Sequence, residues 1–371
     1  MLTRRHVAAS GEVEPRFMFF NESFIDIGED GTLSLSSAFS GLTFQKFGTT
    51  YGSIAYFDSS DLNRFLSISI NVNNASAAYL LLDRGEVIED NQQLEYDSLT
   101  DVTWSHNARL YKSGLAGTTV IGAYSTRLFT VRYDLSLGRF RYVDETTLGY
   151  SASDLAADYV TTTMYICDVT NDKIRIYDRI NHSAIELLDF STSVELSEPP
   201  ILCELNDDGS VLYVMDKIGN VAAYDVSSGN EGTALGSIAL SSFTSNINNV
   251  SDAGNMKYDA DNSTLYVTEG RDGNAIYAID VSNHASMTAT RIAGSTAMVG
   301  GAMVKRPISV EIKYGQLFIF SGEVDGDADV QVICVDNSSA LTTSSEVLGS
   351  LTGAQLGTGT ETGTIGYGKV F

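Results

Sequence analysis

LYVMDKIGNVAAYD, residues 212–225, is the stretch from which the fold of this chain can be predicted. It holds two short runs rich in valine, tyrosine and alanine, and Gly219 and Asn220 lie between them. Runs of this composition, bounded by glycine and asparagine, are typical of two antiparallel strands joined by a tight turn. Each run ends in aspartate, at Asp216 and Asp225. The stretch therefore predicts a β-hairpin with a recognisable closing residue.

The same hairpin pattern recurs along the chain. It returns as MYICDVTNDKIRIYD (164–178), LYVTEGRDGNAIYAID (265–280) and LFIFSGEVDGDADVQVICVD (317–336), and less regular copies end at Asp97 and Asp134. The closing aspartates of consecutive copies are 37 to 56 residues apart. A period of about 40–50 residues is typical of four-stranded propeller blades. The chain is therefore expected to be a β-repeat protein.

Each regular hairpin is preceded by another apolar run, for instance Ile201–Leu205 before the copy at 212–225. Residues 16–37 resemble part of one more copy, and the apolar tail 362–371 is expected to pair with it. Such pairing would join the two ends of the chain and remove exposed sheet edges. The predicted fold is all-β, a β-propeller of about seven four-stranded blades closed by its N- and C-terminal strands, with six or eight blades left open.

The expected domain organisation follows from how regular the copies are. Residues 1–15 form an N-terminal arm, and residues 16–371 form a single β-propeller domain. Within that domain the blades over 16–160 are irregular, those over 160–336 are regular, and 362–371 is the closing strand. The Ser-, Asn- and Thr-rich segments between copies are expected to be surface loops, which carry the binding surfaces of most scaffolds of this kind.

The copy at 265–280 resembles the repeat of the YVTN family of β-propellers, because Leu265–Thr268 matches that family's Tyr-Val-Thr strand. Glu269 stands where the family has asparagine, and the other copies share only the apolar pattern and the closing aspartate. The resemblance covers residues 160–336 and implies the fold more than an activity. Trp-Asp pairs, paired glycines in each copy and sialidase-type Asp boxes, the marks of other propeller families, are missing.

Charge and hydropathy limit the partners of the protein. The 371 residues carry 47 acidic and 23 basic side chains, a formal charge of −24, which disfavours a nucleic-acid partner because phosphates would be repelled. No run approaches the ~20 apolar residues that cross a bilayer, and no signal peptide follows the basic residues near the N-terminus. We expect no membrane insertion, and a location in a virion or in the cytoplasm of the producing cell.

Few residues have the spacing of a site. Asp325, Asp327 and Asp329 alternate like the start of a calcium loop, but Val330 stands where such a loop needs glycine. Calcium at these three aspartates is the one metal hypothesis; otherwise no cofactor and no catalytic residue is predicted. The closing aspartates are expected to accept hydrogen bonds from turn amides, and the four histidines show no ligand spacing. Cys167, Cys203 and Cys334 lie in apolar runs and are expected to be buried free thiols.

These observations leave three hypotheses on function. The first is a non-enzymatic structural or binding propeller of a large assembly, a virion component such as a bacteriophage tail hub, nozzle, spike or head-surface protein. Its partners would be other structural proteins of the assembly or a host surface receptor, and it would be oligomeric in that context. The second is a metal-dependent propeller hydrolase or lactonase. The third is a cytosolic propeller scaffold.

Overall fold

The structure is a computed structural model, and it describes residues 16–20, 23–36, 50–58, 64–71, 76–83, 86–93, 111–112, 119–134, 139–157, 163–178, 183–184, 189–241, 243, 254–269, 275–292, 297–300, 302–304, 307–321, 331–356 and 369–370. In this part of the chain the elements are β-strands together with the short 3-10 helix η3 (His284–Ser286). No helix there is long and apolar enough to cross a membrane. The all-β prediction is confirmed.

Five of the sheets have four antiparallel strands each. Their strands are β29 (Lys369–Val370), β1 (Phe17–Phe20), β2 (Ser23–Ile27) and β3 (Leu33–Leu35); β4 (Thr50–Asp58), β5 (Arg64–Asn71), β6 (Ser76–Asp83) and β7 (Glu86–Gln93); β15 (Pro200–Leu205), β16 (Val211–Asp216), β17 (Asn220–Asp225) and β18 (Thr233–Ala239); β19 (Met256–Asp259), β20 (Thr264–Thr268), β21 (Ile276–Asp280) and β22 (Thr288–Ile292); β25 (Pro307–Lys313), β26 (Gln316–Ser321), β27 (Gln331–Asp336) and β28 (Val347–Thr352).

One further sheet has seven strands, which differs from the predicted uniform units of four. Its strands are β8 (Tyr111–Lys112), β9 (Thr119–Asp134), β10 (Arg139–Ala157), β11 (Thr163–Asp168), β12 (Lys173–Asp178), β13 (Ser183–Ala184) and β14 (Phe190–Ser191). The reason is β10, which pairs with β9 through its first half and with β11 through its second half. Its register with β9 shifts between Thr147 and Ala152, so one strand bends from one pairing to the next. A separate hairpin joins β23 (Ala297–Val299) to β24 (Ala302–Val304).

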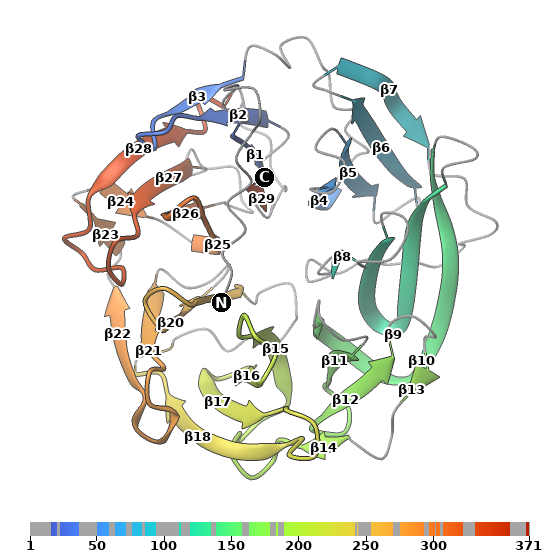
Figure 1. Ribbon diagram of the computed structural model, residues 1–371, viewed down its shortest axis with the longest axis vertical. Coiled ribbons are helices and arrows are strands. Elements are labelled where there is room, and N and C mark those ends of the chain that lie inside the picture. Colours follow the sequence, from blue (N-terminus) through green and yellow to red (C-terminus); the bar gives the residue numbers. More distant parts are fainter. Residues whose placement is uncertain are drawn as a thin grey trace.

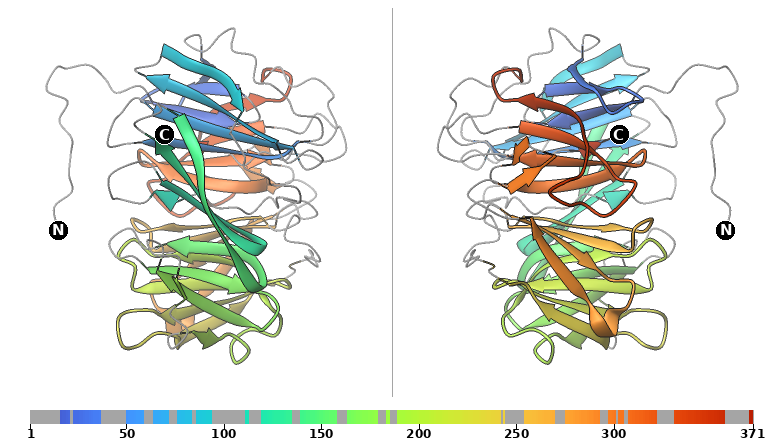
Figure 2. Two further views of the ribbon diagram at one scale, coloured as in Figure 1. Left: turned by 90° about the vertical axis from the view of Figure 1, so that its right-hand side faces the viewer. Right: turned by 90° about the vertical axis from the view of Figure 1, so that its left-hand side faces the viewer.

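The sheets follow one another in chain order around a common centre (Figure 1). The side views show strands running between two ends of the molecule, where the turns and loops gather (Figure 2). The C-terminal strand β29 is paired with the N-terminal strand β1, through Met18 with Val370 and Phe19 with Lys369. The pairing predicted for the two ends of the chain is therefore present.

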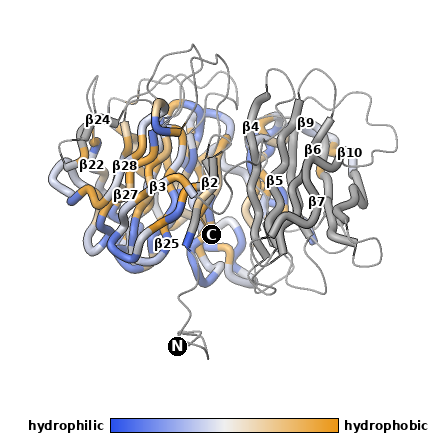
Figure 3. Tube along the Cα trace, turned by 90° about the horizontal axis from the view of Figure 1, so that it is seen from above, coloured by the Kyte–Doolittle hydropathy of each residue, from blue (hydrophilic) through white to orange (hydrophobic). Residues whose placement is uncertain are grey.

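The predicted hairpins over residues 160–336 are all observed, as β11–β12, β16–β17, β20–β21 and β26–β27. Their strands are buried almost throughout, because each sheet packs against a neighbour on both faces; β16 and β26 have no exposed residue. Figure 3 shows this as apolar strands between polar turns. The copy predicted to end at Asp97 lies outside the described residues, as does the arm 1–15.

A tyrosine of the second strand explains the recurring Leu-Tyr pattern. Tyr165, Tyr213 and Tyr266 occupy the same position in three successive sheets, and each is at most 3% exposed. The Tyr165 hydroxyl donates to the Val226 carbonyl at 3.4 Å, and the Leu341 amide donates to the Tyr266 hydroxyl at 2.9 Å. In each case the partner lies in the loop after the third strand of the next sheet. The tyrosine hydroxyls therefore bind neighbouring sheets together.

The first strands of neighbouring sheets are joined by polar side chains. The Asp154 carboxylate on β10 accepts the Cys203 amide of β15 at 3.0 Å. The Asn255 amide group, directly before β19, bonds both backbone groups of Val310 on β25. Asp154 and Asn255 stand at equivalent places in their sheets, one residue before the residues that pair with Ile166 and Val267. These contacts fix neighbouring first strands in register.

Replacing Tyr266 by Phe tests the inter-sheet role of the hydroxyl. The Leu341 amide loses its partner in a buried place, so we expect a loss of about 1–3 kcal/mol in the free energy of unfolding. Urea denaturation would measure it as a lower midpoint with an unchanged slope. Tyr314→Phe, at an exposed tyrosine, is the control and should change the midpoint little. Equal midpoints for the two variants would contradict the role.

Candidate functional site

The closing aspartates act as turn caps, as predicted. The carboxylate oxygen Oδ1 accepts the backbone amide two residues on, from Ser227 to Asp225 at 2.9 Å, from Ser282 to Asp280 at 2.9 Å and from Ser338 to Asp336 at 3.2 Å. Each serine hydroxyl also donates to the same aspartate. The bond from the Ser282 hydroxyl is the largest cause that lowers the pKa of Asp280. The sequence Asp-x-Ser is thus a structural unit.

A second set of acids, at the ends of the second strands, is fully buried. Asp216 accepts the amides of Ile218 at 3.0 Å and Asn220 at 2.9 Å, and the Ser197 amide at 3.2 Å. Asp168 and Glu269 occupy the matching places and are likewise 0% exposed. The sequence shows these acids beside each turn, but their burial depends on packing between sheets. They organise the turns that follow.

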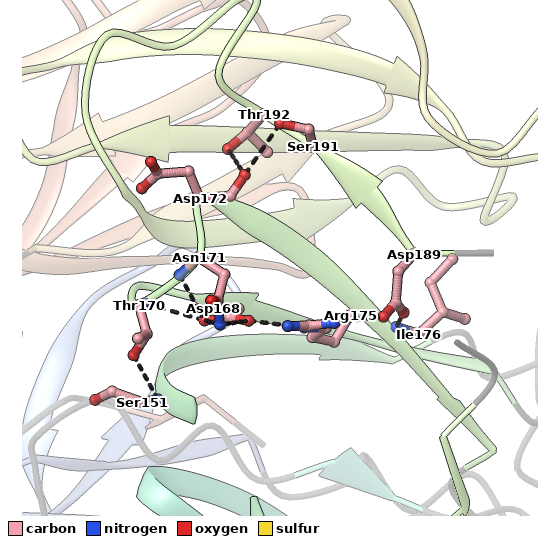
Figure 4. A network of polar contacts seen from close by, with 10 residues as sticks. All are labelled: Ser151, Asp168, Thr170, Asn171, Asp172, Arg175, Ile176, Asp189, Ser191 and Thr192. Carbon is pink, nitrogen blue, oxygen red and sulfur yellow. Dashed lines mark hydrogen bonds and ion pairs between the residues drawn. The ribbon is translucent and has the colours of Figure 1, made fainter. Parts of the chain in front are cut away.

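Asp168 is the centre of the polar network drawn in Figure 4. Its Oδ2 accepts Nε of Arg175 at 2.7 Å, and Oδ1 accepts the amides of Thr170 and Asn171, each at 3.0 Å. Arg175 also donates through Nη1 to Asp189 at 2.9 Å. Hydrogen bonds to two carboxylates raise the pKa of Arg175 although burial opposes them. The charge of Asp168 is therefore paired inside the fold.

Tyr150 covers this network on another side. The Arg175 guanidinium lies 5.0 Å from the centre of the Tyr150 ring, within the range of a cation–π contact. Burial raises the pKa of Tyr150. A comparable group surrounds Glu269: Arg291 bonds the Tyr277 hydroxyl at 3.0 Å and lies 3.5 Å from the Glu269 carboxylate. In both groups an arginine pairs with the buried acid and also contacts a tyrosine.

The two ends of the sheets can be distinguished by their turns. In an antiparallel sheet the turns after the first and third strands lie at one end, and the turn after the second strand lies at the other. We call these the first-turn end and the second-turn end. Asp168, Asp216 and Glu269 close second strands and so belong to the second-turn end. The turns Asn206–Ser210 and Ala260–Ser263 belong to the first-turn end.

The first-turn end carries an acidic cluster between the sheets of β15 and β19, made by Asp207 and by the charged groups that act on it, those of Lys257, Glu204, Asp259 and Asp261. The Lys257 ammonium lies 3.3 Å from the Glu204 carboxylate. Asp207 is exposed, and partial desolvation is the main cause that raises the pKa of its carboxyl. Lys257 opposes this effect, whereas the three other carboxylates add to it. Asp207 is thus an accessible acid with a shifted proton affinity.

Aromatic rings and a histidine adjoin this cluster. Tyr213 stacks on Tyr258 with ring centres 5.6 Å apart, and its hydroxyl lies 3.1 Å from Nε2 of His284. His284 begins η3, whose N-cap is the Asn283 side chain. Gly236 on β18 permits the close approach of η3, because a Cβ there would lie 2.0 Å from the His284 carbonyl oxygen. No pattern in the sequence predicts that Tyr213 and His284 meet, since they belong to different repeats.

The remaining predicted positions divide into two groups. Asp325, Asp327 and Asp329 lie outside the described residues, as do His6, His106 and His182, so calcium stays a prediction. Among the described residues, no group of three or more His, Cys, Asp or Glu side chains is arranged to hold a metal ion. Cys167, Cys203 and Cys334 are buried free thiols, as predicted. Burial raises the pKa of Cys334 to about 12.

No family model matches the sequence, and no curated protein matches it. Several solved structures are similar in fold. A protein from Bacteroides fragilis, provisionally assigned as a 6-phosphogluconolactonase, aligns with a TM-score of 0.59 at 14% identity over 93% of this chain and 99% of its own. A protein from Lactobacillus plantarum aligns at 0.62 and 12% identity over 92% and 99%.

A chain of a mitotic checkpoint complex also aligns, with a TM-score of 0.53 at 9% identity over 81% of this chain and 78% of its own. Identities this low show the fold alone. The chain therefore has a β-propeller-like all-β fold, built largely from sheets of four antiparallel strands. Neither a virion nor a bacteriophage origin finds support among these structures.

Replacing Arg175 by Met tests whether the network of Figure 4 stabilises the fold. The fully buried Asp168 carboxylate would lose its counter-charge, so we expect a loss of about 3 kcal/mol in the free energy of unfolding. The control is Lys217→Gln, which removes the half-exposed Lys217–Glu198 pair and should cost less than about 1 kcal/mol. Urea midpoints measure both. Similar midpoints would show that Arg175 is no more than a surface charge.

Proposed function

We propose that this protein is a β-propeller hydrolase of the lactonase kind, which opens an uncharged ring ester at its first-turn end. The observation that carries the proposal is an accessible carboxyl of raised pKa, Asp207, in one cluster with the ammonium group of Lys257, which itself pairs with Glu204. Titratable groups with shifted pKa values gather at functional sites. The likeness of the fold to a protein provisionally assigned as a lactonase adds support.

The chemistry needs one base and one positive charge. Asp207 in its ionised form takes a proton from water while the water oxygen attacks the ester carbonyl carbon. A raised pKa makes the carboxylate a stronger base near neutral pH. The Lys257 ammonium stabilises the negative oxygen of the tetrahedral intermediate. The ring C–O bond then breaks, and the proton passes from Asp207 to the leaving alkoxide, which yields a hydroxy acid.

The charge of the site favours an uncharged substrate. Four carboxylates, those of Glu204, Asp207, Asp259 and Asp261, adjoin the single ammonium of Lys257, which Glu204 already contacts. A phosphorylated lactone would be repelled by this cluster and by the net charge of −24. The proposed substrate therefore differs from the phosphorylated lactone in the name of the Bacteroides fragilis protein.

We also propose that the propeller has seven blades. The seven-stranded sheet divides at the register shift in β10, which leaves β8, β9 and the first half of β10 in one blade. The second half of β10 joins β11, β12 and the short strands β13 and β14 in the next blade. With the five four-stranded sheets this division makes seven units around the ring of Figure 1. The pairing of β1 with β29 supports closure.

Ring opening by the purified protein tests the enzymatic proposal. Hydrolysis of an uncharged aldonolactone should release acid faster than the uncatalysed reaction, and its 6-phosphate should react more slowly. Asp207→Asn removes the base and should lower kcat/KM by about 10²–10⁴-fold. A pH-stat records both rates, with heat-denatured protein as the blank.

The matched control is Asp208→Asn. Asp208 is the next residue and also exposed, but bonds from Ser210 lower its pKa and fix it in the turn. Its variant should retain wild-type kcat/KM. Equal activity of wild type and Asp207→Asn would reject Asp207 as the base. A wild-type protein that opens no lactone would reject the enzymatic proposal altogether.

A second candidate function is that of a binding component in an assembly, either a virion or a cytosolic scaffold. Two exposed apolar side chains favour it, Val194 at 86% and Ile218 at 43%. Their loops adjoin each other, since the Ser197 amide bonds Asp216 and Lys217 pairs with Glu198. Replacing both Val194 and Ile218 by Ser should abolish co-sedimentation with purified particles. A wild-type protein that stays monomeric and is absent from particles would count against this candidate.

A further inference from the structure

Three junctions between neighbouring sheets can be compared, because both sides of each lie in the described residues. At the junction of β10–β14 with β15–β18, Asp154 bonds the Cys203 amide, Ser153 bonds the Pro200 carbonyl and Tyr165 bonds the Val226 carbonyl. The partners on β15 and in the following loop are backbone groups. The side-chain groups in these bonds are one carboxylate and two hydroxyls.

The junction of β19–β22 with β25–β28 is held in a similar way. Asn255 bonds both backbone groups of Val310, Thr268 donates to the Ile308 carbonyl, and the Leu341 amide donates to Tyr266. Asn337 adds a bond to the Asp259 carboxylate at 3.0 Å. No histidine takes part in these bonds.

The middle junction, between β15–β18 and β19–β22, is different. Its tyrosine contact joins Tyr213 to a histidine side chain, at 3.1 Å from Nε2 of His284. Its contact between first strands is the ion pair of Glu204 and Lys257, at 3.3 Å. The position that holds Asp154 and Asn255 in the other sheets is Leu202 here, which cannot bond a backbone group. Two side-chain pairs therefore stand at positions where the other junctions have bonds to backbone groups, and the Tyr277 hydroxyl adds one bond to the Ser241 carbonyl at 3.2 Å.

We propose that the middle junction is an acid-sensitive latch, in which protonation of His284 releases Tyr213 and frees η3 from β18. The neutral imidazole can accept the Tyr213 hydroxyl proton at Nε2, whereas the imidazolium can only donate. The Tyr213 ring is 1% exposed, so the displaced hydroxyl proton has to find another acceptor in a buried place. The contact that joins the two sheets at this point then weakens.

The surroundings of His284 keep its neutral form. Burial lowers the pKa of His284, and no carboxylate of the described residues offsets this effect. The groups that face it are Tyr213 on β16 and, behind that ring, Tyr258 on β19. Asp208 acts on Tyr213, Asp280 is bound to Ser282, and β18 carries no ionisable side chain.

The sign of the pH effect follows from linkage. The ordinary pKa of histidine is about 6.5, and the latched state holds it lower. Below pH ~6.5 the open state therefore binds a proton that the latched state refuses, and the latch weakens as the pH falls. The Glu204–Lys257 ion pair joins the first strands and does not involve His284. Acid thus opens the outer part of the junction about a hinge at β15 and β19.

Hydrogen–deuterium exchange of the full chain at pH 7.0 and 5.5, corrected for intrinsic exchange rates, tests the latch. Peptides covering η3 and β18 should exchange faster at pH 5.5, with an opening equilibrium that rises by at most about tenfold for each pH unit below 6.5. Peptides covering Leu341 and Val226 report the other two junctions and should not change. The measurement needs no substrate, so it stands or falls independently of the lactonase proposal.

Two variants isolate His284. His284→Gln can still bond Tyr213 but does not titrate, so the acid response of η3 and β18 should vanish. His182→Gln removes a different histidine and should keep the response. If His284→Gln is unstable at neutral pH, Tyr213→Phe replaces it, and η3 should then exchange fast at both pH values. A wild-type protein without the response, or a response that persists in His284→Gln, would overturn the proposal.

Discussion

The bond from a buried tyrosine to the next sheet is the contact on which the ring depends. Apolar faces of two sheets can slide over one another, because the hydrophobic effect has no direction. A hydrogen bond has a direction and a length, so the hydroxyls of Tyr165 and Tyr266 fix one arrangement. In the last regular sheet the matching residue is Phe318. The bond to the following sheet comes instead from Gln316 on the same strand, which donates to the Glu29 carbonyl at 3.5 Å.

Buried acids form the second constraint, and they separate structure from chemistry. A carboxylate inside a protein is costly unless hydrogen bonds or an opposite charge compensate it. Asp168 and Glu269 have arginine partners, and Asp216 has turn amides and an asparagine amide. The charges of these three acids are therefore compensated within the fold. The acids serve to order the turns at the second-turn end. Asp207, by contrast, is exposed and its pKa is raised, so we place the proposed chemistry at the first-turn end.

Local features could be predicted from the sequence, and contacts between repeats could not. The hairpins could be predicted from apolar runs separated by turn residues. The turn caps could be predicted from the residues that follow each closing aspartate. The three cysteines follow from their apolar runs. The cluster around Lys257 brings together residues about 50 positions apart, and Tyr213 meets His284 across 71 positions. The path of β10 through two pairings also escaped prediction, because its register shift depends on β9 and β11 rather than on its own composition.

The fold by itself decides little about function, since similar rings bear unrelated names: a provisional lactonase in one case and a subunit of a checkpoint complex in another. What varies is the chemistry at the two ends of the sheets. Here the acids of the second-turn end are bound by arginines and amides, whereas the first-turn end holds the exposed carboxylates of Asp207 and Asp261 together with the buried ones of Glu204 and Asp259. The same end also holds the junction in which a histidine replaces a backbone partner. Substrate preference and acid sensitivity would then arise at one place, because the acidic cluster and the Tyr213–His284 contact both lie between β15–β18 and β19–β22.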